Sequence, residues 1–191
     1  MKNFILLFTL LLLPIIANHA RGVTIGSSTN AGFDMTINGD HQPFGQSFQA
    51  EGTGLESFSF HYMRGGPGRP DATIPFTLSI HAGIGNGGSL IGAKSFSLNG
   101  AFNGLHAVNF SSLGSVFTIG DQYSAMITTT DNYFLAGSNN GYANGTVIAG
   151  GNSGDYDLLF SATFSVPDTG STAALLGAGV AALAFARRRL G

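Results

Sequence analysis

Cysteine and tryptophan are both absent from this chain of 191 residues, and only 9% of its residues are charged. Without cysteine, the protein forms no disulfide and offers neither a thiol nucleophile nor thiolate ligands for a metal. Its stability must therefore come from packing and hydrogen bonding alone. The absence of tryptophan removes the largest aromatic side chain from any sugar-binding surface, so tyrosine would have to supply such contacts.

Basic residues are scarce in the central part of the chain. Between residues 23 and 165 only Arg64, Arg69 and Lys94 are basic, against nine acidic residues, which gives a net charge of −6 with histidine neutral. Binding to nucleic acid depends on clustered positive charge that neutralises phosphates. The sequence therefore argues against nucleic acid as a partner.

The N-terminal segment, residues 1–22, has the layout of a secretory signal peptide. Lys2 gives it a short basic start, residues 4–13 are apolar, and Pro14 and small residues follow. Cleavage after Gly22 places Ala20 at the −3 position and is sterically favoured over cleavage after Ala20. The alternative is an uncleaved N-terminal anchor, and in either case we expect the body of the protein to be exported.

The C-terminal segment, residues 166–191, combines a short polar motif, an apolar run and a cluster of arginines. Residues 173–186 carry no charge over fourteen positions, and Arg187, Arg188 and Arg189 follow directly. At ~1.5 Å per residue a helix of this length spans roughly 21 Å, against about 30 Å for the hydrocarbon core. We expect a short transmembrane helix that anchors the chain transiently in the inner membrane, with the arginines in the cytoplasm. The alternative, an amphipathic helix docked on the body, needs a polar face that this run lacks.

The polar motif at the start of this segment is specific. It reads Val166, Pro167, Asp168, Thr169, Gly170, Ser171, Thr172. The segment resembles the PEP-CTERM sorting signal of exopolysaccharide-producing Gram-negative bacteria, in the variant that reads VPDSGST, and departs from it only at Thr169. The resemblance implies recognition by an exosortase, a membrane-embedded protease or transpeptidase. It also implies delivery to the cell surface or the extracellular polysaccharide matrix.

The body between the two terminal segments, residues 23–165, is rich in Gly, Ser, Thr, Asn and Phe. This composition disfavours helices and favours strands joined by tight turns. Apolar and polar residues alternate over residues 57–62, 76–81, 106–111, 123–128 and 156–164. Pairs such as Asn-Gly and Gly-Gly separate these runs. We predict a single all-β domain, a β-sandwich of about nine or ten strands.

The body is also weakly similar to secreted bacterial β-sandwich modules of jelly-roll or lectin-like type. The similarity rests on residues 45–50, which read GQSFQA, and on residues 76–83, which read FTLSIHAG. It implies a fold, because sandwiches of this class serve as binding modules, adhesins and enzymes alike.

Candidates for catalysis are few. Glu51 and Glu56 are the only glutamates and lie five residues apart across a Gly-Thr-Gly turn. Glycoside hydrolysis needs two facing carboxylates, and we do not favour this pair for that role. His61 and His81 lie at the polar positions of their alternating strands. They would approach a common metal only if those strands were neighbours. Zinc sites usually show a third ligand or closer spacing, and rim histidines are the better interpretation.

One weak metal candidate lies in the Gly-rich turn before the last strand. Asn152, Asp155 and Asp157 supply the carboxylate and amide oxygens that calcium prefers. Their spacing does not match an EF-hand loop, and Asp and Asn are also ordinary turn formers. No other cofactor is expected.

Three functions are compatible with these features of the sequence. The leading prediction is a non-enzymatic exported protein, a structural or adhesive sandwich sorted to the surface or matrix. The second is a carbohydrate-binding module with a defined glycan site built on tyrosine. The third is a secreted glycoside hydrolase or lyase, which the sequence favours least.

Overall fold

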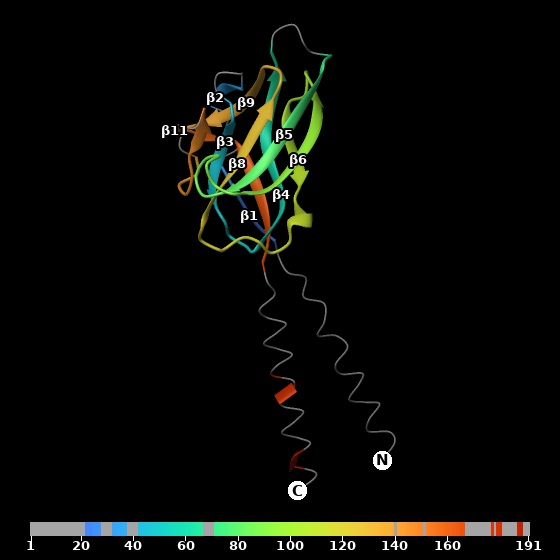
Figure 1. The fold of residues 1–191 in the computed structure, drawn as a ribbon, viewed down its shortest axis with the longest axis vertical. Helices are drawn as coiled ribbons and strands as arrows, with labels where there is room; N and C mark the ends of the chain where they lie inside the picture. The colour runs from blue at the N-terminus through green and yellow to red at the C-terminus, as the bar shows by residue number, and fades with distance from the viewer. Residues whose placement is uncertain are drawn as a thin grey trace. The chain divides into compact units, whose positions relative to one another are not determined.

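A computed structural model describes residues 22–27, 32–37, 42–66, 71–139, 141–150 and 152–166, together with 177, 179–180 and 187–188. Residues 22–166 belong to one compact unit, in which thirteen described strands form two antiparallel sheets (Figure 1). The predicted all-β sandwich is confirmed. The predicted signal peptide lies outside the described residues except for Gly22, as does most of the apolar run 173–186.

The first sheet has seven strands. Its main order is β1 (Val23–Gly26), β13 (Phe160–Ser165), β4 (Gly54–Gly65), β9 (Tyr133–Ser138) and β12 (Asp157–Leu158). Strand β2 (Phe33–Ile37) pairs with β9, and β7 (Gly104–Asn109) pairs with β4. The twelve-residue β4 pairs with β13 over Gly54–Phe60 and with β9 over Tyr62–Gly65, and its register with β9 shifts between Tyr62 and Arg64.

The second sheet has six strands. Its order is β11 (Asn152–Gly154), β10 (Val147–Ala149), β3 (Phe44–Gln49), β8 (Gln122–Thr129), β5 (Thr73–Ala82) and β6 (Leu90–Asn99). A 3₁₀ turn, η3 (Ser111–Leu113), follows β7. From β3 to β9 only β5 and β6 are consecutive strands of one sheet, and every other step crosses to the opposite sheet. This alternation gives the jelly-roll type of sandwich.

The core lies between the two sheets and is rich in aromatic side chains. Phe58, Phe60 and Tyr62 alternate along β4 and are fully buried, as their period-two spacing predicts. The ring of Phe58 stacks on that of Phe160 at 5.4 Å with an interplanar angle of 6°. Full burial of a large apolar side chain contributes about 1.5–3 kcal/mol. Burial of these rings therefore contributes much of the stability that a protein without disulfides requires.

Two details of the strands differ from the prediction. Thirteen strands are described rather than nine or ten, because β1, β10, β11 and β12 have only two to four residues and carry no long alternating pattern. The run 156–164 is also not one continuous strand. It breaks at Leu159, whose N–H binds the carbonyl of Ala136 while its own carbonyl accepts the N–H of His61. The chain changes partner there, from β9 to β4.

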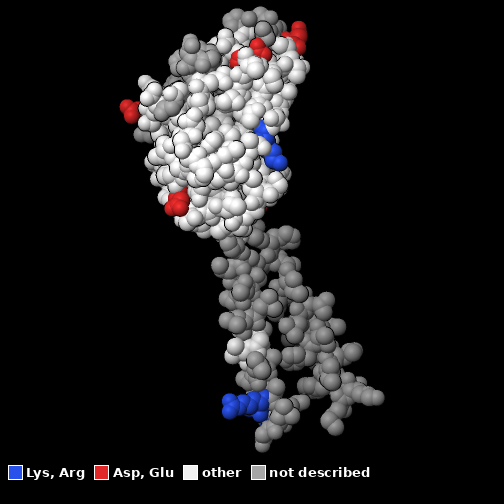
Figure 2. All heavy atoms as spheres, in the orientation of Figure 1, with Lys and Arg blue, Asp and Glu red and all other residues white. Residues whose placement is uncertain are grey.

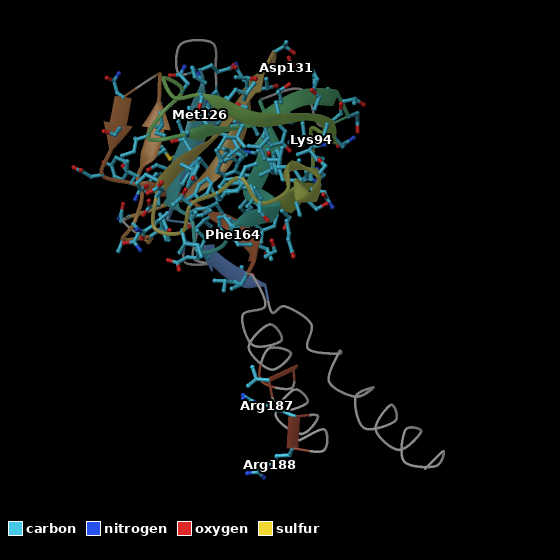
Figure 3. The ribbon with its side chains drawn as sticks, turned by 60° about the horizontal axis from the view of Figure 1, so that its bottom comes forward. Lys94, Met126, Asp131, Phe164, Arg187 and Arg188 are labelled. Carbon is cyan, nitrogen blue, oxygen red and sulfur yellow. The ribbon has the colours of Figure 1, made fainter. Side chains whose placement is uncertain are left out.

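The first and last strands of the sandwich lie side by side. Strands β1 and β13 pair antiparallel with Val23 opposite Phe164, and Figure 3 shows Phe164 close to β1. The chain therefore enters and leaves the sandwich at neighbouring positions on one sheet. Among the residues that the structure describes, no helix has the length and apolar character needed to cross a membrane.

Candidate functional site

The sorting motif begins where the last strand ends. Ser165 is still held in β13, since its hydroxyl donates to the carbonyl of Gly54 and its own carbonyl accepts the N–H of Thr53, both at 3.2 Å. Val166 follows at once, so no linker separates the sandwich from the motif. The rest of the motif, Pro167 to Thr172, and Arg189 lie outside the described residues, whereas Arg187 and Arg188 are described and exposed.

The three residues of the weak calcium candidate have different surroundings. Asn152 and Asp155 are exposed, whereas Asp157 is fully buried. The carboxylate of Asp157 accepts hydrogen bonds from the side-chain amide of Gln46 at 2.7 Å and from the backbone N–H of Tyr142 at 2.8 Å. Its oxygens are thus engaged inside the protein, and the calcium site stays a prediction.

The other sequence candidates do not come together around a metal. His61 lies on β4 in the first sheet and His81 on β5 in the second, so their strands are not neighbours. Glu51 and Glu56 are both exposed. In the described part of the chain, no group of three or more His, Asp or Glu side chains is placed to hold a metal ion.

One tyrosine is available to a ligand, and it is Tyr156. The rings of Tyr62, Tyr123 and Tyr133 are buried. Tyr142 is half-buried, packs edge-on against Phe160 at 5.1 Å and uses its hydroxyl to accept the N–H of Gln49. Burial raises its pKa, and the nearby carboxylates of Glu51 and Asp157 add to that shift. Tyr156 is 48% exposed, the only aromatic side chain among the large exposed apolar groups of the described residues.

Tyr156 lines a groove at one side of the sandwich, hereafter called the edge groove. Its volume is about 610 Å³, and its walls come from β2 of one sheet and from β3 and β10 of the other. The lining residues are Phe33, Asp34, Met35, Thr36, Phe44, Asn139, Ala149 and Tyr156. The volume lies within the ~300–1,000 Å³ typical of small-molecule sites, and the mainly apolar lining with a few polar groups is also typical.

The aromatic wall of the edge groove is held in place by packing. The ring of Phe33 meets that of Tyr156 edge-to-face, with centroids 5.3 Å apart. Gly137 on β9 makes room for Phe33, because a Cβ atom there would lie 2.7 Å from Cε2 of the phenylalanine ring. Asp34 forms an ion pair with Arg64 at 3.6 Å, and the Arg64 guanidinium lies 5.1 Å from the ring centre of Phe134.

Two further hollows on the surface offer fewer groups suited to binding a ligand. One, of about 470 Å³, lies over β5, β6 and β8 and is lined mainly by Thr and Ser residues. Figure 2 shows that the face bearing these strands is largely uncharged, with acidic groups towards its rim. The other, of about 540 Å³, includes His61 and Leu105, and His61 binds the side-chain carbonyl of Asn103 at 3.1 Å. Neither contains an exposed aromatic ring.

Sequence comparison identifies the C-terminal segment. Residues 165–190 match the family model of the VPDSG-CTERM motif, a PEP-CTERM-like sorting signal, so the predicted resemblance is confirmed for this segment. No curated protein matches the chain.

Structure comparison finds distant similarity only. The clostridial cysteine protease Cwp84 after propeptide cleavage is 10% identical with a TM-score of 0.48, covering 78% of this chain and 41% of that one. The cysteine protease and lectin-like domains of Cwp84, a surface layer associated protein of Clostridium difficile, are 8% identical with a TM-score of 0.39, covering 70% and 36%. The VP2 subviral particle of infectious bursal disease virus is 10% identical with a TM-score of 0.38, covering 79% and 34%. This chain spans about two fifths or less of the length of each.

Proposed function

We propose that this chain is a non-enzymatic structural or adhesive protein of the cell surface or the extracellular polysaccharide matrix. Its C-terminal signal marks it for export and cell-surface display. An exosortase-type enzyme in the inner membrane processes that signal, and the sandwich is the part that is delivered.

The direct junction between β13 and the motif is the observation that supports this proposal best. Hydrogen bonds hold Ser165 in the sandwich, and the motif starts at Val166. Val23, the residue that follows the expected signal-peptide cleavage site, lies in β1 opposite Phe164. Removal of both terminal segments at these positions would therefore leave every described strand of the sandwich intact.

Deletion of residues 166–191 in the native host tests the sorting step of this proposal. We expect the truncated protein to be released into the periplasm or medium in a folded form, because the deletion removes the sorting signal and no strand. Fractionation with an antibody against the sandwich would measure it. Envelope association unchanged from that of the full chain would contradict the proposal. Replacement of Arg187, Arg188 and Arg189 by glutamine is the matched milder change. It should weaken retention of the C-terminal segment in the inner membrane.

A carbohydrate-binding module with a defined glycan site is the second candidate. The exposed ring of Tyr156 in the edge groove favours it, because a sugar site needs an accessible aromatic surface beside polar groups. A secreted glycoside hydrolase or lyase stays the least favoured candidate. It would predict release of sugars from matrix polysaccharide by the purified protein and loss of that release in Glu51→Gln or Glu56→Gln.

A further inference from the structure

We infer that the edge groove is a saccharide-binding site that takes a neutral pyranose unit on the ring of Tyr156. This inference rests on the second candidate under the proposed function, a defined glycan site, which would give the exported protein a specific point of contact with polysaccharide. It also selects one tyrosine from the five in the sequence.

The first argument is the accessibility and rigidity of the ring. Tyr156 is 48% exposed, and the edge-to-face contact with Phe33 supports its ring on one side. A sugar ring presents apolar C–H faces and a polar rim of hydroxyls. An aromatic ring held in advance loses little conformational entropy when such a face covers it.

The second argument is the polar surroundings of the ring. Asn139 lines the groove and is exposed, and its side-chain amide can both donate to and accept from sugar hydroxyls. Strand β2 pairs with β9 on one side, and no described strand pairs with its other side. An edge strand presents unpaired backbone N–H and C=O groups, which adds further partners for hydroxyls along Asp34 and Thr36.

The third argument is charge, which selects the class of saccharide. Asp155 is exposed and adjacent to Tyr156 in the sequence, whereas the charge of Asp34, which lines the groove, is offset by Arg64. Residues 23–165 carry a net charge of −6. A uronate or sulfated polymer would meet repulsion here, so the groove favours neutral sugars.

An extended peptide that adds to β2 is a different occupant, and two features of β2 oppose it. The strand has only five residues, and it bears the charged Asp34. Short length and charge are the devices by which edge strands avoid pairing with other chains. The sugar is therefore the better fit to the groove.

The test measures binding of neutral oligosaccharides to the full chain in detergent micelles. Gluco-, manno- and galacto-oligosaccharides of one length are titrated by calorimetry, with an oligogalacturonate of equal length as the charged comparator. We expect saturable binding of at least one neutral series and weaker binding of the oligogalacturonate. Tyr156→Ala should weaken binding about tenfold or more, corresponding to roughly 1.4 kcal/mol, whereas Tyr156→Phe should keep most of it.

Ile119→Ala is the matched control, since Ile119 is 53% exposed and is not part of the groove. It should bind as the unchanged protein does. If Tyr156→Ala fails to fold by circular dichroism, Asn139→Ala provides the same test from the polar side of the groove. Absence of binding for all three neutral series, or equal affinity in the groove variants and the control, would overturn the inference, as would preferential binding of extended peptides. Surface delivery of Tyr156→Ala, measured by fractionation, is expected to be normal, so failure of sorting and failure of sugar binding are distinguishable.

Discussion

The side chain of Gln46 joins the two sheets of the sandwich by binding Asp157. Its Nε2 atom lies 2.7 Å from Oδ1 of Asp157, and both residues are fully buried. The side-chain carbonyl oxygen of Gln46 accepts the N–H of Leu158 at 2.8 Å, so one amide connects β3 with both residues of β12. Buried polar groups are tolerated when they are hydrogen-bonded in this way, and they become costly when one partner is removed.

Gln46→Leu should therefore destabilise the protein strongly. The change leaves the buried carboxylate of Asp157 without one donor and the N–H of Leu158 without its acceptor, at a cost of about 3 kcal/mol or more. Urea unfolding of the full chain would measure it. Gln49→Ala is the control, because that side chain donates a single exposed bond to Gly120 and its loss should cost less than about 1 kcal/mol. Equal losses of unfolding free energy in the two variants would contradict a stabilising contact between Gln46 and Asp157.

Tyr62 and Tyr133 should respond differently to loss of their hydroxyls. Both residues are fully buried in one aromatic cluster, with ring centroids 5.9 Å apart. The Tyr133 hydroxyl donates to the carbonyl of Phe102 at 2.9 Å, whereas the Tyr62 hydroxyl has no hydrogen-bond partner among the described residues. Tyr133→Phe should cost about 1 kcal/mol of unfolding free energy, and Tyr62→Phe should be neutral or stabilising. Thermal unfolding of the two variants decides this, and a loss in Tyr62→Phe as large as in Tyr133→Phe would count against it.

Acid should weaken the fold through His106. This ring stacks on Phe96 at 4.7 Å, and burial lowers the pKa of His106 below its ordinary value of 6.5. The unfolded chain therefore binds the proton more readily than the folded protein does. The resulting contribution to stability is complete above pH 6.5 and is lost as the pH falls from there through the lowered pKa. Unfolding free energies measured from mildly acidic to mildly alkaline pH should show this slope, and His106→Phe should flatten it. An unchanged slope in the variant would exclude His106 as its source.

Alkaline conditions should weaken the fold through Tyr133. Burial raises the pKa of this phenol from 10.0 to about 12. The unfolded chain loses its phenolic proton first, so this contribution to stability is complete below pH 10 and is lost as the pH rises towards 12. Stability measured across that range should fall less steeply in Tyr133→Phe than in the unchanged protein. The same slope in both would show that another group is responsible.

The sequence predicted most of the sandwich but little of the groove. Alternation placed Phe58, Phe60 and Tyr62 on one face of a strand, and the structure confirms this because local spacing determines which side chains share a face. Alternation placed Tyr156 on the same face as Leu158, Phe160, Ala162 and Phe164. Those four side chains are buried, whereas the ring of Tyr156 is exposed. The break, where the chain changes its pairing partner, falls at Leu159, an apolar residue at a position where the alternation calls for a polar one, and the prediction passed over that signal.

The other features that the sequence did not reveal have a common physical cause, which is contact between distant parts of the chain. The buried setting of Asp157 depends on Gln46, which lies 111 residues earlier. The edge groove depends on Phe33 and Asn139, neither of which was singled out, because β2 and the segment before β12 are brought together in the fold by their common neighbour, β9. A polar residue in a strand of aromatic neighbours, such as Gln46 between Phe44 and Phe48, is the signal that could have indicated a buried partner.

The most direct test of the proposed function is the covalent state of the protein recovered from the cell surface. Intact mass and terminal sequencing would identify both ends of the delivered chain. We expect an N-terminus at Val23, the first residue of β1, and a C-terminus within residues 166–172, with every strand of the sandwich retained. Surface protein that still carries residues 173–191 would contradict processing of the sorting signal and with it the central claim.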